Sequence, residues 1–243
     1  MSALDRALDL LDLFGPDTTA LSLTELSAGS GLPLSTCHRL AATLVARGYL
    51  DRGEDRRYRV GVGLWSVAQR SPLSDRLRES ALPALARLYE ETGENITLAV
   101  LDGGRALYVE RLMGERSIPT VSRAGARLPL HTTGVGKVLL AYQPEAAIAA
   151  HLSAPLERPT RDALADPARL RRDLAETRAR GYSVTRQEMT LGSASVAVPI
   201  LQAGRCVAAV GVIVHLARLD PPRLVATLSR AAAAIVAELE RLD

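Results

Sequence analysis

Two short helices joined by a tight turn, with a hairpin directly behind them, constrain this 243-residue chain more than any other feature. Residues 22–25, SLTE, form a capping box, in which serine and glutamate side chains bond backbone N–H groups at a helix start. Gly31 ends that helix, and a second helix is predicted over residues 35–47, closed by Gly48. Two helices separated by so few residues are typical of a helix-turn-helix.

The polar side of the second helix contains no carboxylate. Asp or Glu would be repelled by a nucleic-acid duplex, whereas hydroxyl and guanidinium groups can reach base edges and phosphates. On a helical wheel such groups lie opposite Leu40 and Leu44. They belong to Ser35, Thr36, Arg39 and Thr43. We predict that this face lies against DNA. A helical hairpin whose exposed face is simply rich in arginine is the alternative.

A basic hairpin follows the second helix. Residues 49–52 and 57–60 are strand-like and flank a loop at residues 53–56, which makes this segment a wing. Residues 1–70 hold eight arginines and eight acids, but residues 35–59 hold six arginines and three acids. A basic stripe on a domain of zero net charge indicates a polyanion partner.

The chain changes character after the Ser-Pro pair at 71–72, where we place a domain boundary. Before it lie an amphipathic helix over residues 3–14 and a short helix over residues 63–70. After it we predict a helix over residues 73–92, which Pro83 should kink or break because proline lacks the N–H that a helix needs.

Beyond Gly93 the sequence pattern becomes that of strands joined by turns, such as the Asp-Gly-Gly at residues 102–104. The expected strands are residues 95–101, 105–112, 118–123, 182–185, 194–201 and 205–214. Helices are expected after residue 133, over residues 167–180 and from residue 221 onward. An antiparallel sheet with segregated helices is the α+β pattern. We therefore divide the chain into a DNA-binding domain (1–70), a linker helix (71–92) and a second domain (93–243).

The GVGK segment at residues 134–137 invites a nucleotide-binding interpretation, which its neighbours contradict. A phosphate loop needs a glycine five residues earlier and a hydroxyl residue after the lysine, and His131 and Val138 occupy those positions. The third glycine of a dinucleotide fingerprint would fall on Leu139. Two interpretations remain open: a glycine turn that lets backbone approach a ligand at a helix start, or a simple helix entry.

No pattern in the sequence predicts catalysis. A nucleophile elbow of the G-x-S-x-G type is missing. The four histidines at positions 38, 131, 151 and 215 do not pair at the spacing of metal ligands. We expect neither a catalytic site, a metal site nor a cofactor, and therefore not an enzyme.

Three features of the sequence predict a cytoplasmic protein. Its two cysteines, Cys37 and Cys206, are too far apart in sequence to indicate a disulfide framework. Three aspartates within residues 1–14 are incompatible with a secretory signal. The longest apolar runs are far shorter than the roughly 20 residues that span a bilayer, so no membrane partner is expected.

The whole chain resembles the IclR family of bacterial transcriptional regulators. The resemblance rests on LPLSTCHRLAATLVARGYL with its wing DRRYRVGVGLW, on LPLHTTGVGKVLLAY, and on GSASVAVPIL followed by GRCVAAVGVIV. It implies an N-terminal winged helix-turn-helix, a linker helix and a C-terminal GAF-like domain that binds a small effector. It also implies homodimers, often paired into tetramers, that act on operators near catabolic genes.

Carried over by position, the resemblance implies two sets of site residues. The DNA-binding set is Ser35, Thr36, His38, Arg39 and Thr43, with Arg56 and Arg57 on the wing. The effector-binding set is Thr120, Leu128, Gly134, Val135, Thr185, Ser193, Ser195, Gly211 and Ile213. Members that hold small carboxylates tend to place an acid, a cysteine and two serines where this chain has Thr185, Ser195, Gly211 and Ile213. That departure favours a ligand larger or less polar than a small keto acid, although these strand positions could also be core.

We therefore expect a repressor that binds a near-palindromic double-stranded operator and is controlled by an organic or aromatic acid of catabolism. The alternative hypothesis is a metabolite-binding protein or enzyme whose N-terminal module contacts another protein. Salt-dependent binding to duplex DNA discriminates between the two.

Overall fold

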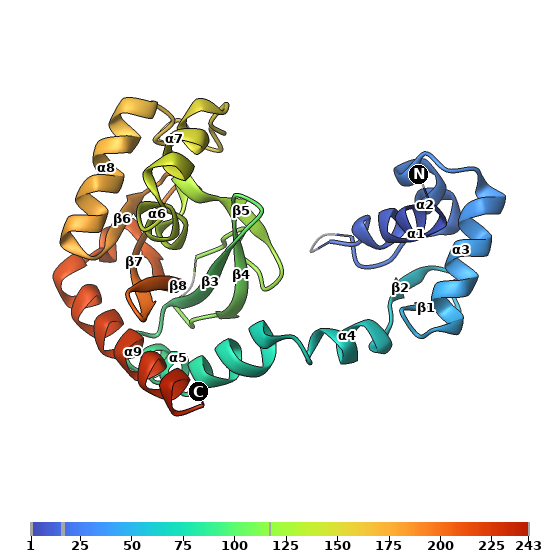
Figure 1. Cartoon of the computed structure of the whole chain (residues 1–243), viewed down its shortest axis with the longest axis horizontal. Coiled ribbons are helices and arrows are strands. Elements are labelled where there is room, and N and C mark those ends of the chain that lie inside the picture. The colour runs from blue at the N-terminus through green and yellow to red at the C-terminus, as the bar shows by residue number, and fades with distance from the viewer. Residues whose placement is uncertain (1, 16–17, 117, 243) are drawn as a thin grey trace. The chain divides into compact units, whose positions relative to one another are not determined.

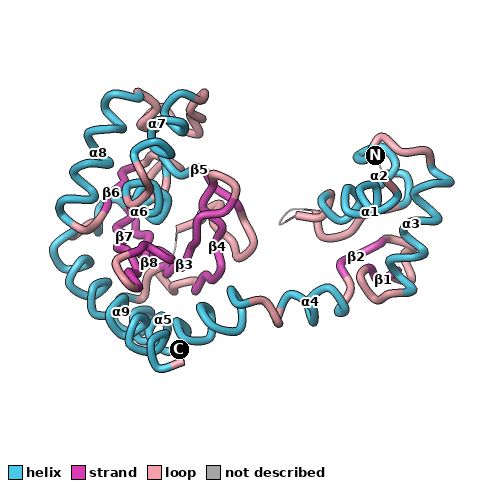
Figure 2. Tube along the Cα trace, viewed as in Figure 1, coloured by secondary structure: helices cyan, strands magenta, loops and turns pink. Residues whose placement is uncertain are grey.

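The computed structural model describes residues 2–15, 18–116 and 118–242. The chain forms two compact units, residues 1–75 and 76–243. Figure 1 labels the elements of both units, and Figure 2 distinguishes helices, strands and loops. The two units are described separately below.

The N-terminal unit is a helix-turn-helix followed by a two-stranded hairpin, as the sequence predicts. Its elements are α1 (Ala3–Asp12), α2 (Leu23–Ser30), α3 (Leu34–Ala46), β1 (Leu50–Arg52), β2 (Tyr58–Val60) and α4 (Val62–Ala68). The predicted capping box is present at the start of α2, with Ser22 Oγ accepting from Glu25 N at 3.2 Å. Gly31 ends α2 at φ 68°, a conformation that glycine adopts without strain.

A small hydrophobic core fixes how these elements pack. Leu10 of α1, Leu26 of α2 and Leu40 of α3 are buried together with Leu50 and Tyr58 from the hairpin. Tyr58 also exchanges two backbone hydrogen bonds with Leu21, at 2.7 and 2.9 Å. The hairpin is therefore tied to the segment that enters α2, and α3 can turn its other side to solvent.

The C-terminal unit is built on a curled, six-stranded antiparallel sheet. The strands are β3 (Asn95–Asp102), β4 (Arg105–Leu112), β5 (Arg127–Pro129), β6 (Ser183–Arg186), β7 (Ser193–Gln202) and β8 (Arg205–His215). Their spatial order is β5-β4-β3-β8-β7-β6. The neighbouring strands β7 and β8 pair so that Val196 lies opposite Val212, and both side chains are fully buried. This arrangement is the predicted α+β fold.

Helices cover both faces of the sheet. They are α5 (Glu79–Thr92), α6 (Gly134–Ala141), α7 (Glu145–Ser153), α8 (Pro167–Arg180) and α9 (Pro221–Arg241). α6 packs on one face and carries α8 on its outer side, whereas α5 and α9 pack against each other and against the opposite face (Figure 1). All eight residues of α6 are buried, and all but Lys137 are apolar or glycine, as expected of a helix that is covered on every side.

Pro83 does not break its helix, so the predicted break is wrong. The chain is helical without interruption from residue 72 to residue 92. Directly ahead of α5 lies a π-helical turn, Leu73–Arg78. A proline cannot donate the backbone bond of an α-helix, and a widened turn on its N-terminal side accommodates the ring without ending the helix.

The strand predicted over residues 118–123 is also wrong. The strand at this edge of the sheet, beside β4, is β5, and the residues before it form an irregular loop. Pro119 has no N–H to donate to a ladder. Side chains bond this loop's carbonyl groups instead: Arg111 donates to Ser122 O, and Asn95 Nδ2 donates to Ile118 O at 3.4 Å. These two contacts come from neighbouring strands that the local sequence of the loop does not reveal.

Candidate functional site

The polar side of α3 is open to solvent. Ser35, His38, Arg39 and Thr43 are exposed and Thr36 is half-buried. The opposite side of the helix, with Cys37, Leu40, Ala41 and Leu44, is buried in the core of the N-terminal unit. The first turn contains no acidic residue, and Pro33 at the N-cap leaves the first N–H groups without a side-chain acceptor. This surface therefore offers hydrogen-bond donors and positive charge without a competing carboxylate.

The hairpin arginines divide into paired and unpaired groups. Arg59 is bidentate on Asp55, at 3.0 and 2.6 Å, and Arg52 lies 5.4 Å from the centre of the Tyr58 ring. Hydrogen bonds from Arg59 lower the pKa of Asp55 to about 2. Arg56 is exposed at the tip of the loop, with φ 60°. Arg56 therefore presents its charge to solvent, whereas Arg59 is neutralised by its neighbour.

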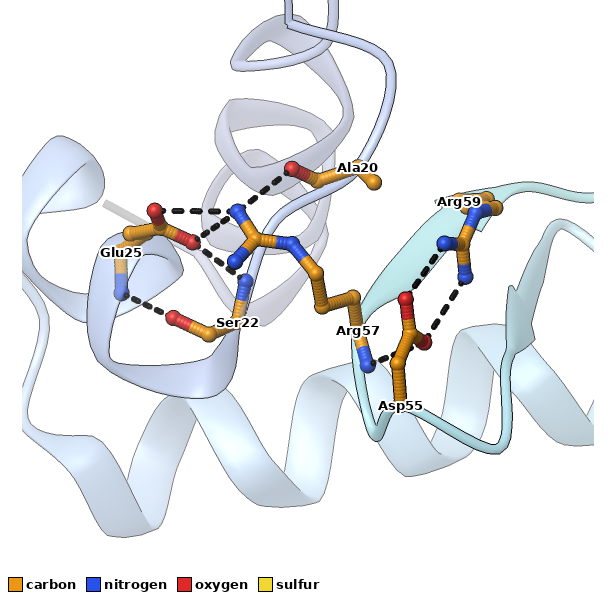
Figure 3. Close-up of polar contacts among 6 residues, drawn as sticks. All are labelled: Ala20, Ser22, Glu25, Asp55, Arg57 and Arg59. Carbon is orange, nitrogen blue, oxygen red and sulfur yellow. Dashed lines mark hydrogen bonds and ion pairs between the residues drawn. The ribbon is translucent and has the colours of Figure 1, made fainter.

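Arg57 is committed to a contact inside the N-terminal unit. Its Nη2 donates to both carboxylate oxygens of Glu25, at 3.0 and 2.7 Å, and to Ala20 O at 3.0 Å (Figure 3). Bonds from Ser22 lower the pKa of Glu25, and Arg57 lowers it further. The contact links the hairpin to the start of α2, on the side away from its core. Sequence reasoning found Arg57 but missed Glu25 as its partner.

The second site is a cavity on the α6 side of the C-terminal sheet, with an empty volume of about 450 Å³ that is partly open to solvent. All nine positions named from the resemblance line it: Thr120, Leu128, Gly134, Val135, Thr185, Ser193, Ser195, Gly211 and Ile213. They come from the loop before β5, from α6, and from β5 to β8. The curled sheet brings these distant segments to one place.

Sequence reasoning missed several other lining residues. Thr97 and Tyr108 face the cavity from β3 and β4, Thr132 and Thr133 from the turn before α6, and Met189 from the loop after β6. The two threonines lie inside the LPLHTTGVGK segment, so their signal was present. Thr97 and Tyr108 carried a weaker signal, because alternation along a strand shows which residues share a face but not which face encloses a cavity.

Hydroxyl groups dominate the polar part of the cavity wall. Thr185 Oγ1 and Ser195 Oγ share a hydrogen bond at 2.6 Å, and Thr120 Oγ1 and Ser122 Oγ share one at 2.9 Å. Of the described lining residues, Tyr108 alone has a side chain that ionises in the ordinary range, and burial raises its pKa. The wall is therefore uncharged at neutral pH and suited to holding a ligand rather than to transferring protons.

The N-terminus of α6 points at this cavity. Thr133 caps the helix by accepting from Gly136 N at 3.2 Å, and Ser183 Oγ donates to Gly134 O at 2.7 Å. The N–H groups of Gly134 and Val135 have no acceptor within the helix. A Cβ on Gly134 would lie 2.5 Å from Ser195 Oγ, so only glycine allows this close approach. The structure therefore shows a close approach of the backbone at this helix start, and the partner is Ser195.

A buried ion cluster holds α6 to the loop after β6. Lys137 is 1% exposed, and its Nζ lies 2.9 Å from both Glu188 Oε1 and Asp173 Oδ2. Burial raises the pKa of Glu188, although the lysine opposes that shift. Met189 directly follows Glu188 and lines the cavity, so the cluster positions one wall of the cavity.

Two histidines that look scattered in sequence are neighbours in the fold. The rings of His131 and His151 are 5.8 Å apart, and His131 Nε2 bonds Glu157 O at 2.8 Å. Burial lowers the pKa of both histidines. Among the residues that the structure describes, no three His, Cys, Asp or Glu side chains gather to form a metal site.

Comparison with known proteins assigns both units. Residues 3–54 match the family described as "IclR helix-turn-helix domain", and residues 73–237 match "Bacterial transcriptional regulator IclR C-terminal". The chain is 35% identical to the HTH-type transcriptional regulator XynR of Escherichia coli, over 92% of this chain and 90% of that protein. It is 32% identical to the transcriptional repressor IclR of the same organism, over 84% and 76%.

Solved structures agree with this assignment. An IclR homolog from Microbacterium hydrocarbonoxydans, complexed with 4-hydroxybenzoate, superposes with a TM-score of 0.95 at 33% identity, covering 99% of this chain and 100% of that one. The Thermotoga maritima IclR structure gives a TM-score of 0.77 at 28% identity, covering 97% and 98%. In the part of the chain that the structure describes, no helix combines the length and the apolar character needed to cross a bilayer. The relatives are transcriptional regulators, and this chain belongs to the IclR family, with an N-terminal helix-turn-helix and a C-terminal effector-binding domain.

Proposed function

We propose that this regulator represses transcription by binding a near-palindromic operator and that a small organic acid in the C-terminal cavity controls this binding. The observation that carries the proposal is that the nine positions implied by the family resemblance all line one hydroxyl-lined cavity. An effector acts through its different affinities for the DNA-competent and DNA-incompetent arrangements of the protein. Neither binding step requires catalysis, so we propose a cytoplasmic binding protein and not an enzyme.

The effector that fits best is a carboxylate about the size of a single aromatic ring. The structural relative from Microbacterium hydrocarbonoxydans holds 4-hydroxybenzoate. In the present chain, the free N–H groups of Gly134 and Val135 and the positive end of the α6 dipole favour an anion. Apolar side chains such as Leu128 and Ile213 favour a ring beside it. Thr185 and Ser195 offer hydroxyl groups to the same end of the ligand.

For the operator, we propose that α3 enters the major groove. Ser35, Thr36, His38, Arg39 and Thr43 then read bases and phosphates, and Arg56 holds the backbone from the hairpin. We assign Arg57 to the same interface as the residue that holds the hairpin, in place of the direct phosphate contact that the resemblance implies. The assignment rests on its bonds to Glu25 and Ala20.

We further propose that the active species is a homodimer or a tetramer. Apolar side chains are exposed on two helices of the N-terminal unit: Leu4 and Leu8 on α1, and Val62, Trp65 and Val67 on α4. α4 buries no residue at all within its own unit. Two recognition helices related by a two-fold axis read two half-sites about one helical turn apart, which makes the operator a near-palindrome.

The experiment combines operator selection with ligand screening. DNA is selected from a random pool by the full chain, and binding is measured by fluorescence anisotropy for the unmodified protein and Arg39→Ala. We expect Arg39→Ala to weaken operator binding by about 10- to 100-fold, the cost of losing a guanidinium contact of about 1–3 kcal/mol. Unchanged affinity would contradict the proposed recognition surface.

The ligand part uses thermal unfolding. 4-Hydroxybenzoate at about 100 times its dissociation constant should stabilise the C-terminal unit by roughly 2.7 kcal/mol. It should stabilise Arg39→Ala to the same extent, because that residue lies in the other unit. A panel of aromatic and aliphatic acids that shifts nothing would contradict the proposed effector class.

A further inference from the structure

Beside the cavity lies a guanidinium without a carboxylate partner. Arg111 of β4 donates to Ser122 O and, at 3.3 Å, to Asn95 Oδ1, and its Nε is buried without a hydrogen-bond partner. Among the described residues, no acid accepts a hydrogen bond or forms an ion pair with its guanidinium, although its backbone N–H donates to Glu110 Oε1 at 2.9 Å. A half-buried guanidinium without a counter-charge attracts an anion. Arg111 is not among the residues that line the cavity itself.

The strand register places Arg111 on the cavity side of the sheet. Arg111 pairs with Thr97 of β3, and Thr97 pairs with Gly211 of β8. Directly opposed residues of adjacent strands project to the same face. Because Thr97 and Gly211 both line the cavity, the side chain of Arg111 leaves the sheet on that face.

A bulge in β4 makes this possible. Tyr108 lines the cavity, and by simple alternation Arg111, three residues later, would project to the opposite face. The register shifts between Leu98 and Ala99, so that Tyr108 lies opposite Ala99 and Arg111 opposite Thr97. One extra residue on β4 therefore brings the phenol and the guanidinium to the same side.

The cavity consequently has two polar ends. One is the helix pole, formed by the N–H groups of Gly134 and Val135, which lies over β7 because Gly134 approaches Ser195 so closely. The other is the arginine pole, formed by the hydroxyl pair of Thr120 and Ser122, which line the cavity, together with Arg111, which donates to Ser122 O.

The two poles stand far enough apart for a ring to lie between them. β4 and β7 are separated in the sheet by β3 and β8, a distance of about three strand spacings or roughly 14 Å. Between them the floor is Thr97 and Gly211, which carry no charge. A single elongated ligand can therefore contact both ends at once.

Taking the proposed function as its basis, we infer that the arginine pole is a second anion-recognising subsite, so that the cavity selects acids that carry a second negative group opposite the first. The paired anions sit at the helix pole and on Arg111. Burial and the nearby charge of Arg123 lower the pKa of Arg111, and a bound anion would offset both effects by favouring the charged guanidinium. A second carboxylate supplies the partner that Arg111 lacks within the chain.

The test measures ligand preference in the full chain by isothermal titration. Three rigid probes are compared: benzene-1,4-dicarboxylate, its monomethyl ester and benzoate. We expect the dianion to bind the unmodified protein at least tenfold more tightly than the ester, which has nearly the same size but lacks the second charge.

Three variants distinguish the effect of the charge of Arg111 on ligand binding from the effect of its hydrogen bonds to the loop. Arg111→Gln should bring the ratio of the two affinities close to one. Arg111→Lys should preserve the preference for the dianion, although a lysine cannot repeat both bonds to the loop. Arg105→Gln is the matched control, since Arg105 lies on the same strand but pairs with Glu157. Its affinity ratio should remain that of the unmodified protein.

Each remaining outcome overturns the inference. If Arg111→Gln weakens all three probes equally, Arg111 only supports the Thr120–Ser122 loop. If the unmodified protein binds benzoate or the ester as tightly as the dianion, the second subsite is wrong while the proposed effector class stands. If none of the aromatic acids binds, both the subsite and that effector class are wrong. The unmodified protein alone provides the last two results, so the test does not depend on a variant that folds.

Discussion

At the scale of single residues, glycine and histidine show how tightly the site depends on local geometry. Gly134 lets the start of α6 approach β7 so closely that a Cβ at this position would lie 2.5 Å from Ser195 Oγ. His131 is 2% exposed and is anchored through one ring nitrogen, so its protonation is opposed by its surroundings. Both residues belong to the LPLHTTGVGK segment, and both lead to measurable predictions.

Gly134→Ala should lower the affinity for the effector while leaving operator binding unchanged. The new methyl group would meet Ser195 Oγ at 2.5 Å, which forces that hydroxyl away from Thr185 and into the cavity. We expect the dissociation constant for 4-hydroxybenzoate to rise by about tenfold, or 1.4 kcal/mol. Calorimetric titration of the full chain measures it. An unchanged constant would show that the ligand does not use this end of the cavity.

His131 should make the C-terminal unit less stable in acid. Burial lowers its pKa from 6.5, so the unfolded chain takes up a proton at a higher pH than the folded chain. The free energy of unfolding is therefore complete above pH 6.5 and falls as the pH drops through the lowered folded value. Urea unfolding at pH 7.5 and pH 5.5 measures this loss. Relative to the unmodified chain, His131→Gln should lose less stability between the two pH values, and an equal loss in both proteins would refute the assignment.

At the scale of elements, the position of the hairpin depends on one ion pair. Its strands are three residues long, and so short a hairpin has little stability of its own. Tyr58 buries the inner side of the hairpin, and Arg57 ties the outer side to Glu25 at the start of α2. Helix α3 lies between α2 and the hairpin in the sequence. The Arg57–Glu25 ion pair therefore connects the two elements on either side of α3.

Glu25→Gln distinguishes the two possible roles of Arg57. Glutamine preserves the capping box of α2 but removes the charge that holds Arg57. If Arg57 positions the hairpin, operator affinity should fall by about two- to fivefold, in line with the modest strength of an exposed ion pair. If Arg57 instead contacts phosphate directly, the freed guanidinium should raise the affinity. Anisotropy titrations at constant salt give the sign, and Asp55→Asn serves as the control on the neighbouring pair.

At the scale of the whole molecule, two units with separate cores carry separate tasks. The N-terminal unit carries α3 and the hairpin, which we propose contact DNA, and the C-terminal unit encloses the cavity. Exposed apolar residues on α1 and α4 indicate that the N-terminal unit has a further partner, which we propose is a second copy of the chain.

The single tryptophan reports on this self-association. Trp65 is 62% exposed on α4, so its fluorescence should be red-shifted in a monomer and should move to the blue if a partner covers it. We expect the shift to follow protein concentration in parallel with the mass from analytical ultracentrifugation. Trp65→Gln should weaken the dimer and reduce operator affinity. Met113→Gln, at another exposed apolar residue, is the control and should change neither property. A monomer at all concentrations, with no emission shift, would contradict the proposal.

Much of the fold could be predicted from local patterns. The capping box at residues 22–25, the turn at Gly31 and the strand alternation of residues 95–112 act over a few residues, and the structure has each in place. The failures at Pro83 and at residues 118–123 have a different origin. In both, contacts or backbone adjustments outside the local window, such as the Arg111 bond to Ser122, decided the outcome.

The sequence alone predicted most of the helices and strands and showed that the polar side of α3 lacks acids, because periodicity, capping and turn signals are properties of neighbouring residues. The nine effector positions came instead from the resemblance to the IclR family. Only the tertiary structure decided that Arg57 pairs with Glu25, that His131 meets His151, and that Arg111 stands beside the cavity. Those contacts arise where the sheet register and one bulge bring distant residues onto a common face, and no local pattern encodes that register.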